Sequence, residues 1–271
     1  MSGKFNKAML IGMAISIGLL GASQSMAYDG GAPGGASITG KITFKGTPPA
    51  PKLFSFAKFP QPNFCSQADS DGKGNRVLKE VNVENGALRD VVVYIEDIKK
   101  GKPFNFKGTE VKANMCRFLA QGGPSTFVGV VMNKAKISIE NTDADPSDPK
   151  TKDGVLHNPH GYEVKGSSNT TMFNKPLPTK GQVITEKVKL RKHDSAMKVE
   201  CDQHGFMQVW FFPVENPYYT IVGNDGSFAI DQVPAGKYEV EAWHPILGHQ
   251  EKEVTVSASG KVEVDFDFKA Q

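Results

Sequence analysis

The sequence predicts an all-β protein of the sandwich or barrel type, and two observations lead to this prediction. Short runs rich in β-branched and aromatic residues recur along the chain, several of them with period-two alternation, as in "ASITGKITF", "DVVVYIEDI" and "KYEVEAW". Gly, Pro, Asn and Asp separate these runs, as in "KGTPPAP", "GNDG" and "VPAG". Past the N-terminal apolar run, no window of about eleven residues carries a helical stripe, so we expect strands throughout.

The expected strands are short, and turn chemistry sets where they end. "NDG" is typical of a tight hairpin, and "VPAG" places Pro before a Gly that can adopt a positive φ. In chain order, the expected strands are 36–44, 90–98, 126–141, 182–190, 196–201, 208–214, 226–230, 237–243, 252–256 and 261–268.

Residues 1–27 form a predicted secretory signal. Lys4 and Lys7 precede the apolar run "AMLIGMAISIGLLGA", and small residues near Ala27 suit a cleavage site. The run is shorter than the roughly 20 residues that a bilayer-spanning helix needs, so an uncleaved single span is the less favoured alternative. We therefore expect a periplasmic or secreted protein with no membrane span after cleavage. Residues 28–36, "YDGGAPGGA", are expected to form a flexible lead-in.

Charge and catalytic patterns exclude some functions. The formal net charge is +3, and removal of Lys4 and Lys7 with the signal lowers it by two. Such a balance favours no charged partner, and we expect no nucleic-acid binding. No Ser/His/Asp or paired-carboxylate arrangement stands out, so hydrolysis has no candidate residues and we expect no enzyme.

Three cysteines are an odd number for an exported chain. Cys65 and Cys116 are available for a disulfide in an oxidising compartment, which leaves Cys201 over. Cys201 lies in "CDQHGFM", where His204 and Met207 follow at intervals of three. A thiolate, an imidazole and a thioether together favour copper, whereas zinc is more often held by Cys and His alone. The alternative for Cys201 is a buried free thiol that acts as a small apolar side chain.

An electron-transfer copper site of the trigonal type has two His and one Cys, with a weak axial Met, so one more imidazole is needed. "LHNPHG" offers His157 and His160 just after a loop rich in Pro and Asp. The remaining histidines are His193, His244 and His249. The residues alone leave the choice between them open.

"ISIENTD", the later "LHN" and the strand-ending "VECDQHGFM" together resemble the cupredoxins, the small blue copper proteins. In that family one ligand His lies on an upstream loop, and the Cys, second His and Met lie on one loop between the last two strands. The close spacing here is similar to that of the amicyanin group, although the stretch 144–157 is longer than the usual approach to the upstream His. The resemblance implies a cupredoxin-like Greek-key sandwich with one type 1 copper, held by His157, Cys201, His204 and Met207.

The resemblance also implies roles for neighbouring residues. In cupredoxins the Asn after the upstream His ties the two ligand loops together, so Asn158 is expected to orient a ligand without touching the metal. The same match favours His157 over His160. His204 is expected at the exposed edge through which electrons pass, with Phe206 beside it. Plain core packing is the alternative for Phe206.

The C-terminal strands resemble a second family. "GNDGSFAIDQVPAGKYEVEAW" and "VEVDFDF" are similar to the carboxypeptidase regulatory-like domain, a small transthyretin-like β-sandwich, and "ITGKITFKGTPP" resembles its opening strand. That fold usually serves as a scaffold or mediates contacts. The whole pattern resembles exported methylamine-utilisation-like proteins. The expected divisions are a signal at 1–27, a lead-in at 28–36, an N-terminal β region at 37–105, a cupredoxin-like copper domain at 106–214 and a regulatory-like domain at 215–271. The N-terminal β region could belong to the same sandwich as the regulatory-like domain.

Two weaker patterns have plainer interpretations. Four aspartates lie in a loop that lacks the Gly and terminal Glu of a known calcium loop, so a solvated loop is favoured over a calcium site: Asp143, Asp145, Asp148 and Asp153. His244 and His249 in "WHPILGHQ" are expected to be surface histidines of a turn, with a second metal site as the alternative.

The function expected from the sequence is that of an exported one-electron carrier between redox proteins, with one type 1 copper and no substrate of its own. A copper-binding or copper-delivery protein is the first alternative. A β-sandwich scaffold or interaction module is the second. The electron donor and acceptor are not specified by any motif.

Overall fold

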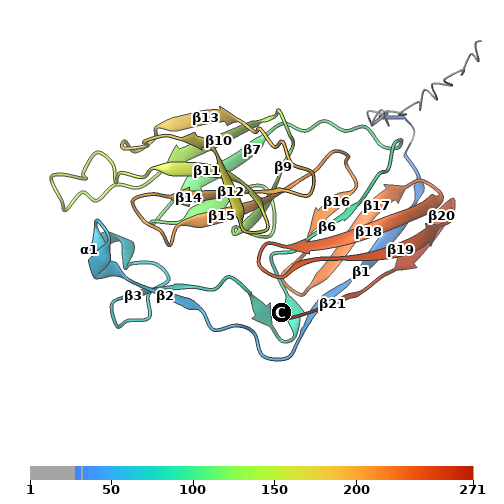
Figure 1. The fold of residues 1–271 in the computed structure, drawn as a ribbon, viewed down its shortest axis with the longest axis horizontal. Helices are drawn as coiled ribbons and strands as arrows, with labels where there is room; N and C mark the ends of the chain where they lie inside the picture. Colours follow the sequence, from blue (N-terminus) through green and yellow to red (C-terminus); the bar gives the residue numbers. More distant parts are fainter. Residues whose placement is uncertain (1–27, 32, 271) are drawn as a thin grey trace, which may run out of the picture.

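The computed structural model describes residues 28–31 and 33–270, so the predicted signal at 1–27 lies outside the described residues. The prediction of an all-β sandwich architecture is confirmed, because the described chain consists of strands with two single-turn helices (Figure 1). Within that part of the chain, no helix is long and apolar enough to cross a membrane.

Strands from the two ends of the chain form one pair of sheets, which we call the terminal sandwich (Figure 1). Strand β1 (Gly35–Lys45) pairs antiparallel with β17 (Ser227–Val233) and parallel with β20 (Ser259–Glu263), so the chain's beginning is locked between its last strands. The same sheet also contains β4 (Val83–Glu84), β5 (Ala87–Leu88) and β21 (Phe266–Lys269). The second sheet has the order β16 (Tyr219–Ile221), β6 (Val92–Ile95), β18 (Gly236–His244) and β19 (Gly248–Val256).

Residues between these ends form a second pair of sheets, the central sandwich. One sheet has the order β13 (Val183–Lys187), β10 (Lys136–Asn141), β7 (Thr109–Ala113) and β8 (Phe118–Ala120). The other has the order β12 (Ser168–Asn174), β11 (Pro159–Lys165), β14 (Ala196–Cys201), β15 (Gln208–Pro213) and β9 (Val128–Val131). Alternation decides which face is buried: Ile137 and Ile139 of β10 point into the core that also receives Val199 of β14.

The two sandwiches contact each other through a small aromatic cluster. Phe212 of β15 lies between Tyr94 of β6 and Trp243 of β18, with ring centroids 4.5 Å and 5.3 Å away. Val92 and Val128 are fully buried in the same cluster. This contact buries side chains of β9 and β15 of the central sandwich against β6 and β18 of the terminal sandwich.

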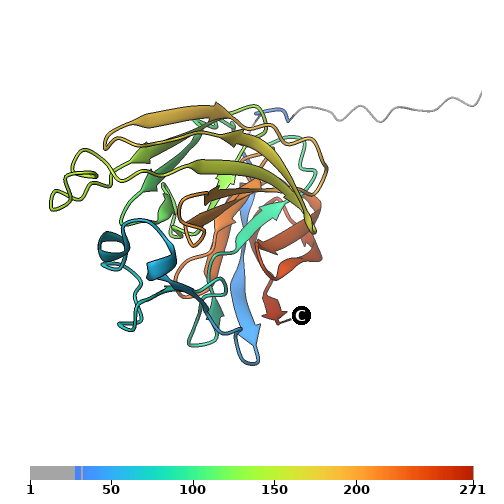
Figure 2. The same ribbon diagram turned by 60° about the vertical axis from the view of Figure 1, so that its left-hand side comes forward.

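A separate segment, residues 52–78, leaves the terminal sandwich and packs on the core of the central one. We call it the arm. It contains β2 (Lys52–Ser55), a 3-10 turn η1 (Phe56–Lys58), α1 (Pro62–Cys65) and β3 (Asn75–Leu78). β2 and β3 pair only with each other, so no sheet hydrogen bonds join the arm to either sandwich. Figures 1 and 2 show it in blue, outside both pairs of sheets.

The structure differs from the predicted strands at identifiable places. The expected run 126–141 is two strands, β9 and β10, in different sheets, because a turn in which the Ala135 amide donates to the Met132 carbonyl reverses the chain. β11 was not expected, since Pro159 and Gly161 interrupt its pattern. The polar strand β12 lies mostly exposed and has no alternation to reveal it.

Candidate metal centre

Strand pairing brings the upstream histidine to Cys201. β11 begins at Pro159, and Pro159 lies opposite Cys201, the last residue of β14. His157 and Asn158 immediately precede that pair, so the antiparallel register places them at the end of β14. His157 is held there by backbone hydrogen bonds in both directions with Leu177.

The spacing in "CDQHGFM" produces a compact loop between β14 and β15. The His204 amide donates to the Cys201 carbonyl at 3.2 Å, and the Met207 amide donates to the His204 carbonyl at 2.8 Å. The Cys201 amide then donates to the Met207 carbonyl at 3.1 Å, which closes the loop. Two successive tight turns therefore put Cys201, His204 and Met207 together, all of them no more than 1% exposed.

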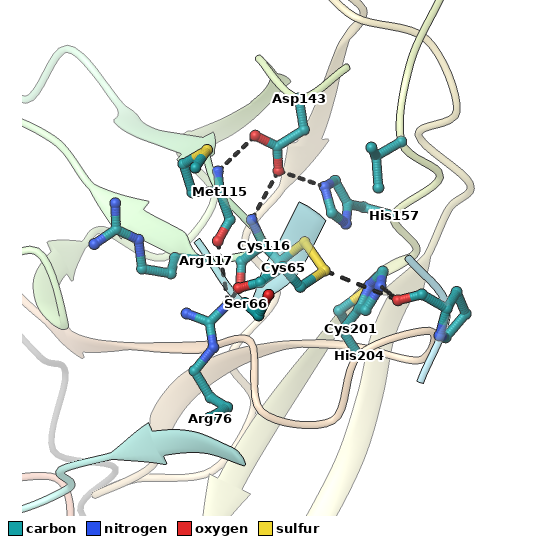
Figure 3. Close-up of a disulfide and its surroundings, with 12 residues drawn as sticks. Cys65, Ser66, Arg76, Met115, Cys116, Arg117, Asp143, His157, Cys201 and His204 are labelled. Carbon is teal, nitrogen blue, oxygen red and sulfur yellow. Dashed lines mark hydrogen bonds and ion pairs between the residues drawn. A yellow bond between two sulfur atoms is a disulfide. The ribbon is translucent and has the colours of Figure 1, made fainter. Parts of the chain in front are cut away.

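Ligand atoms of His157, Cys201 and His204 all lie within 4.8 Å of one another. His204 Nδ1 is 3.8 Å from Cys201 Sγ, and the two imidazole centroids are 5.3 Å apart. Met207 is buried in the same core cluster. The structure thus brings three of the four sequence-predicted ligands, His157, Cys201 and His204, into one enclosed place (Figure 3).

The first imidazole is oriented by a buried carboxylate. His157 Nε2 lies 2.9 Å from Asp143 Oδ2, while His157 Nδ1 is buried with no hydrogen-bond partner. Asp143 also accepts hydrogen bonds from the backbone amides of Met115 and Cys116. Burial alone would raise the pKa of Asp143, but the hydrogen bonds from His157 and these amides outweigh it and lower the pKa. A charged Asp143 holds the imidazole proton on Nε2, which leaves the Nδ1 lone pair free.

The second imidazole is oriented from the arm. His204 Nε2 donates to the Pro60 carbonyl at 3.2 Å, so its Nδ1, on the Cys201 side, carries the lone pair. Burial, and then the neighbouring His157, lower the pKa of His204 to about 4. His204 is therefore neutral at neutral pH, which is the state a metal ligand requires.

The thiol receives backbone hydrogen bonds. The Asn158 amide donates to Cys201 Sγ at 3.3 Å. Burial raises the pKa of the Cys201 thiol, although the amides of Asn158, Gln203 and His204 act in the opposite direction. The Asn158 side chain donates to Asp202 Oδ2 at 2.9 Å, so this residue links the upstream loop to the loop that follows β14.

His160 lies outside this centre. Its Nε2 lies 2.8 Å from Thr171 Oγ1, and its Nδ1 lies 3.0 Å from Asp202 Oδ1 and 2.7 Å from the Tyr162 hydroxyl. Both ring nitrogens therefore have partners on the outer face of β11. Between His157 and His160, only His157 lies beside Cys201.

One expectation about this centre is wrong. His204 was expected at an exposed edge, yet it is fully buried, and Phe206 is 3% exposed. The arm is the reason: Phe54, Phe56 and Phe59 all pack edge-on against Phe206, with centroids 5.0–6.1 Å away. Phe206 therefore packs in the core, which was the alternative expectation for this residue.

Two other interpretations need correction. Asp143 is 2% exposed and paired with His157, so it does not belong to a solvated loop, whereas Asp153 is exposed as expected. His244 is fully buried rather than a surface histidine, and its Nδ1 accepts the amides of Ile246 and Leu247. His249 instead faces outward.

The histidines of the terminal sandwich do not form one site. His249 Nδ1 lies 3.0 Å from Glu241 Oε1 and 3.9 Å from Glu251 Oε1, and these three residues form a separate group of potential ligands. His244 takes no part in that group. His193 is exposed and pairs with Asp194.

No sequence pattern pointed to Arg76, which is 2% exposed and lies beneath the candidate centre (Figure 3). Its Nη2 lies 3.1 Å from each of three backbone carbonyls, those of Cys65, Met115 and Cys116. Its guanidinium also lies 4.6 Å from the centroid of Phe206. Arg76 therefore connects the arm, the turn between β7 and β8, and the ligand loop.

The arm is also joined covalently to the same turn. Cys65 and Cys116 form a disulfide, and Cys201 is the free cysteine. Ligand atoms of Cys65, Cys116 and His204 lie within 4.8 Å of one another, so the disulfide is a direct neighbour of the second imidazole. Figure 3 shows the disulfide beside Cys201 and His204. No sequence signal placed this disulfide near the centre.

Comparisons with known proteins find similar folds only. No protein-family model matches the chain, and no curated protein matches it. A copper-containing nitrite reductase from Thermus scotoductus aligns over 43% of this chain and 24% of its own, at 12% identity and a TM-score of 0.28. Amicyanin from Paracoccus versutus aligns over 41% and 85%, at 13% identity and a TM-score of 0.26.

A purple cupredoxin from Nitrosopumilus maritimus aligns over 32% of this chain and 78% of its own, at 16% identity and a TM-score of 0.24. At these identities and TM-scores, the likeness does not assign the chain to a family. The resemblance of the C-terminal strands to the regulatory-like domain, and of the whole chain to methylamine-utilisation-like proteins, stays a prediction.

Proposed function

We propose that this chain is an exported type 1 copper protein that carries single electrons between redox proteins and turns over no substrate of its own. The observation that carries the proposal is the pair of imidazoles at Cys201. Asp143 and Pro60 accept from Nε2 of His157 and His204, so both rings turn an Nδ1 lone pair inward: His157 Nδ1 has no partner, and His204 Nδ1 lies 3.8 Å from Cys201 Sγ.

The donor set fits copper. Two imidazoles, one thiol and one thioether are available from His157, Cys201, His204 and Met207, which is the combination found in electron-transfer copper sites. A buried, unpartnered His157 Nδ1 is costly in a protein with nothing bound, and a metal would satisfy it. When bound, the copper would supply a one-electron couple.

The chain's own residues supply the rest of the chemistry. Asp143 and Pro60 fix both tautomers, and the Asn158 amide donates toward the sulfur, where it stabilises negative charge. Strands β11, β14 and β15 hold the donors on neighbouring strand ends. A rigid donor set of this kind limits rearrangement when the charge of the site changes by one.

Export is supported by the disulfide. Cys65 and Cys116 are paired, and such bonds persist in oxidising compartments. The predicted signal at 1–27 agrees with that location. The partners we propose are redox proteins of a type that no feature of the chain specifies.

The test is the visible spectrum of the purified protein loaded with copper, first oxidised and then reduced. We expect an intense thiolate-to-copper band that bleaches with one electron equivalent. The band should vanish in Cys201→Ser and His157→Ala but persist in the matched control His160→Ala, because His160 lies outside the centre. Copper bound without colour would favour a delivery protein. A chain that binds no metal would leave the scaffold alternative.

A further inference from the structure

The candidate centre is closed to solvent, which raises the question of how a metal enters it. His157 and His204 are fully buried, and Cys201 and Met207 are each 1% exposed. The arm covers the side of the centre that His204 forms. Two further sulfur atoms, those of Cys65 and Cys116, lie on that side.

The arm depends on few attachments. No sheet hydrogen bonds join it to the sandwiches, since β2 and β3 pair only with each other. It is held by the disulfide between Cys65 and Cys116, by Arg76, and by aromatic packing on Phe206. The Pro60 carbonyl adds the hydrogen bond from His204. Reduction of the disulfide would remove the only covalent attachment among these contacts of the described chain.

The disulfide and the centre share a ligand. His204 belongs to two groups of potential metal donors, one with His157 and Cys201 and one with Cys65 and Cys116. In both groups the ligand atoms lie within 4.8 Å of one another. The Pro60 carbonyl marks the junction, since it lies 3.2 Å from His204 Nε2 and 3.9 Å from Cys65 Sγ.

We propose that Cys65 and Cys116, in their dithiol state, form with His204 a second metal site that binds Cu(I) next to the His157–Cys201–His204 centre. Two thiolates and an imidazole are soft donors that select Cu(I). Re-formation of the disulfide by a thiol oxidant, which accepts two electrons, destroys this site and fastens the arm, so a metal captured in the dithiol state is left with the inner centre. The proposal deepens the proposed function and rests on it only for this last transfer.

The chemistry balances with a dithiol reductant. The Cys65–Cys116 bond accepts two electrons and two protons, and the reductant becomes a disulfide. Cu(I) then forms two Cu–S bonds and one Cu–N bond to the neutral His204 imidazole, whose single proton stays on the ring nitrogen that does not bind the metal. The two thiol protons pass to solvent. The copper keeps its oxidation state in this binding step.

The experiment uses Cys201→Ser, which removes the thiolate of the inner centre, and Cu(I) alone as the probe, in competition with a coloured Cu(I) chelator. We expect the dithiol form of this variant to bind one Cu(I) at least about 100-fold more tightly than its disulfide form. The triple variant Cys65→Ser/Cys116→Ser/Cys201→Ser should bind no more tightly than the disulfide form. X-ray absorption of the loaded dithiol form should show two sulfurs and one imidazole nitrogen, with the nitrogen lost when His204→Asn is added.

Equal Cu(I) affinity in the dithiol and disulfide forms would overturn the proposal. A dithiol protein whose NMR spectrum shows an unfolded central sandwich would also overturn it, because His204 would no longer lie beside the two thiols. The transfer is read separately: the wild-type dithiol protein loaded with one Cu(I) is treated with three equivalents of ferricyanide, two for the disulfide and one for Cu(I) to Cu(II), and should become coloured. If the dithiol site binds but no colour ever forms in the wild type, the proposed carrier function fails and the second site stands.

Discussion

Replacement of Asp143 by Asn tests whether this carboxylate fixes the His157 imidazole. Oδ2 of Asp143 receives His157 Nε2 and the Cys116 amide, both at 2.9 Å, and Oδ1 receives the Met115 amide. An amide of the same shape offers one oxygen and one NH2. If the oxygen takes the Oδ2 position, the NH2 opposes the Met115 amide; if it takes the Oδ1 position, the NH2 opposes both other donors.

Either orientation has a cost that the structure allows us to size. At least one buried donor loses its acceptor, which costs about 1–3 kcal/mol, and the remaining hydrogen bonds lose the help of a charge. We expect Asp143→Asn to lower the free energy of unfolding of the metal-free protein by about 2–5 kcal/mol. Copper affinity should fall by about 10- to 100-fold, as is usual when the partner of a ligating His is changed.

The assays are urea unfolding of the metal-free protein, copper competition, and 15N NMR of the His157 ring, which reports the tautomer directly. Asp153→Asn is the matched control, because Asp153 is an exposed carboxylate of the same loop and its loss changes the net charge equally. If the two variants have unfolding free energies within about 0.5 kcal/mol of each other and equal copper affinities, Asp143 does not orient His157.

Two further predictions concern stability. Burial lowers the pKa of His204 from 6.5 to about 4 and that of His244 to about 3. Below pH 6.5 the unfolded chain therefore binds protons that the folded chain does not. The folded metal-free protein should be most stable above pH 6.5 and should lose stability as the pH falls toward 4 and 3. The His204 share is about 3 kcal/mol, and urea titrations between pH 7 and pH 4 should show a smaller pH dependence for His204→Gln; an identical dependence would contradict the assignment. Arg76→Met removes the guanidinium that donates to three carbonyls and pairs with Asp69, and should cost about 3–5 kcal/mol of unfolding free energy, with part retained by Arg76→Lys. A loss of less than about 1 kcal/mol in urea unfolding would show that Arg76 is not an essential connection.

Local patterns predicted the parts of this molecule that local chemistry determines. The spacing of Cys201, His204 and Met207 needs only two tight turns, and a turn is visible in a heptapeptide. Apolar and polar residues alternate in "AMKVEC" and "KYEVEAW", as is typical of strands with one buried face. Such features depend on neighbours within a few residues.

The arm shows what such patterns do not contain. The contact between Pro60 and His204 spans 144 residues and uses a backbone carbonyl, which every residue type possesses. Arg76 looks like an ordinary surface cation in the sequence, and its burial is tolerable because Asp69 pairs with it and three backbone carbonyls, two of them from a distant segment, accept its hydrogen bonds. Asp143 was visible as a strand-end acid, but its role depends on β10 ending beside His157. The exposure predicted for His204 was wrong because it was inherited from a resemblance that contains no arm.

In the proposed electron carrier, the burial of His204 means that electrons would have to cross the arm or another part of the protein, and Phe59 provides the test. Phe59 is half-buried, its ring centroid lies 5.0 Å from that of Phe206, and it precedes Pro60, which accepts from His204, so its ring helps cover the residues beside His204. Phe59→Ala should therefore raise the rate at which a small anionic oxidant such as ferricyanide oxidises the reduced copper protein severalfold, because the oxidant can approach the imidazole more closely.

The structural cost of Phe59→Ala should be about 1–3 kcal/mol, which leaves the fold intact for the measurement. Phe104→Ala is the matched control: Phe104 is also a partly buried aromatic residue, but it packs in the cluster between the two sandwiches. Equal oxidation rates for the two variants would mean that electrons leave by a route that does not pass His204, and the arm would then be a structural brace alone. A selective increase in Phe59→Ala would mean that the arm slows indiscriminate oxidation, so that a protein partner must make contact over the arm to reach the centre.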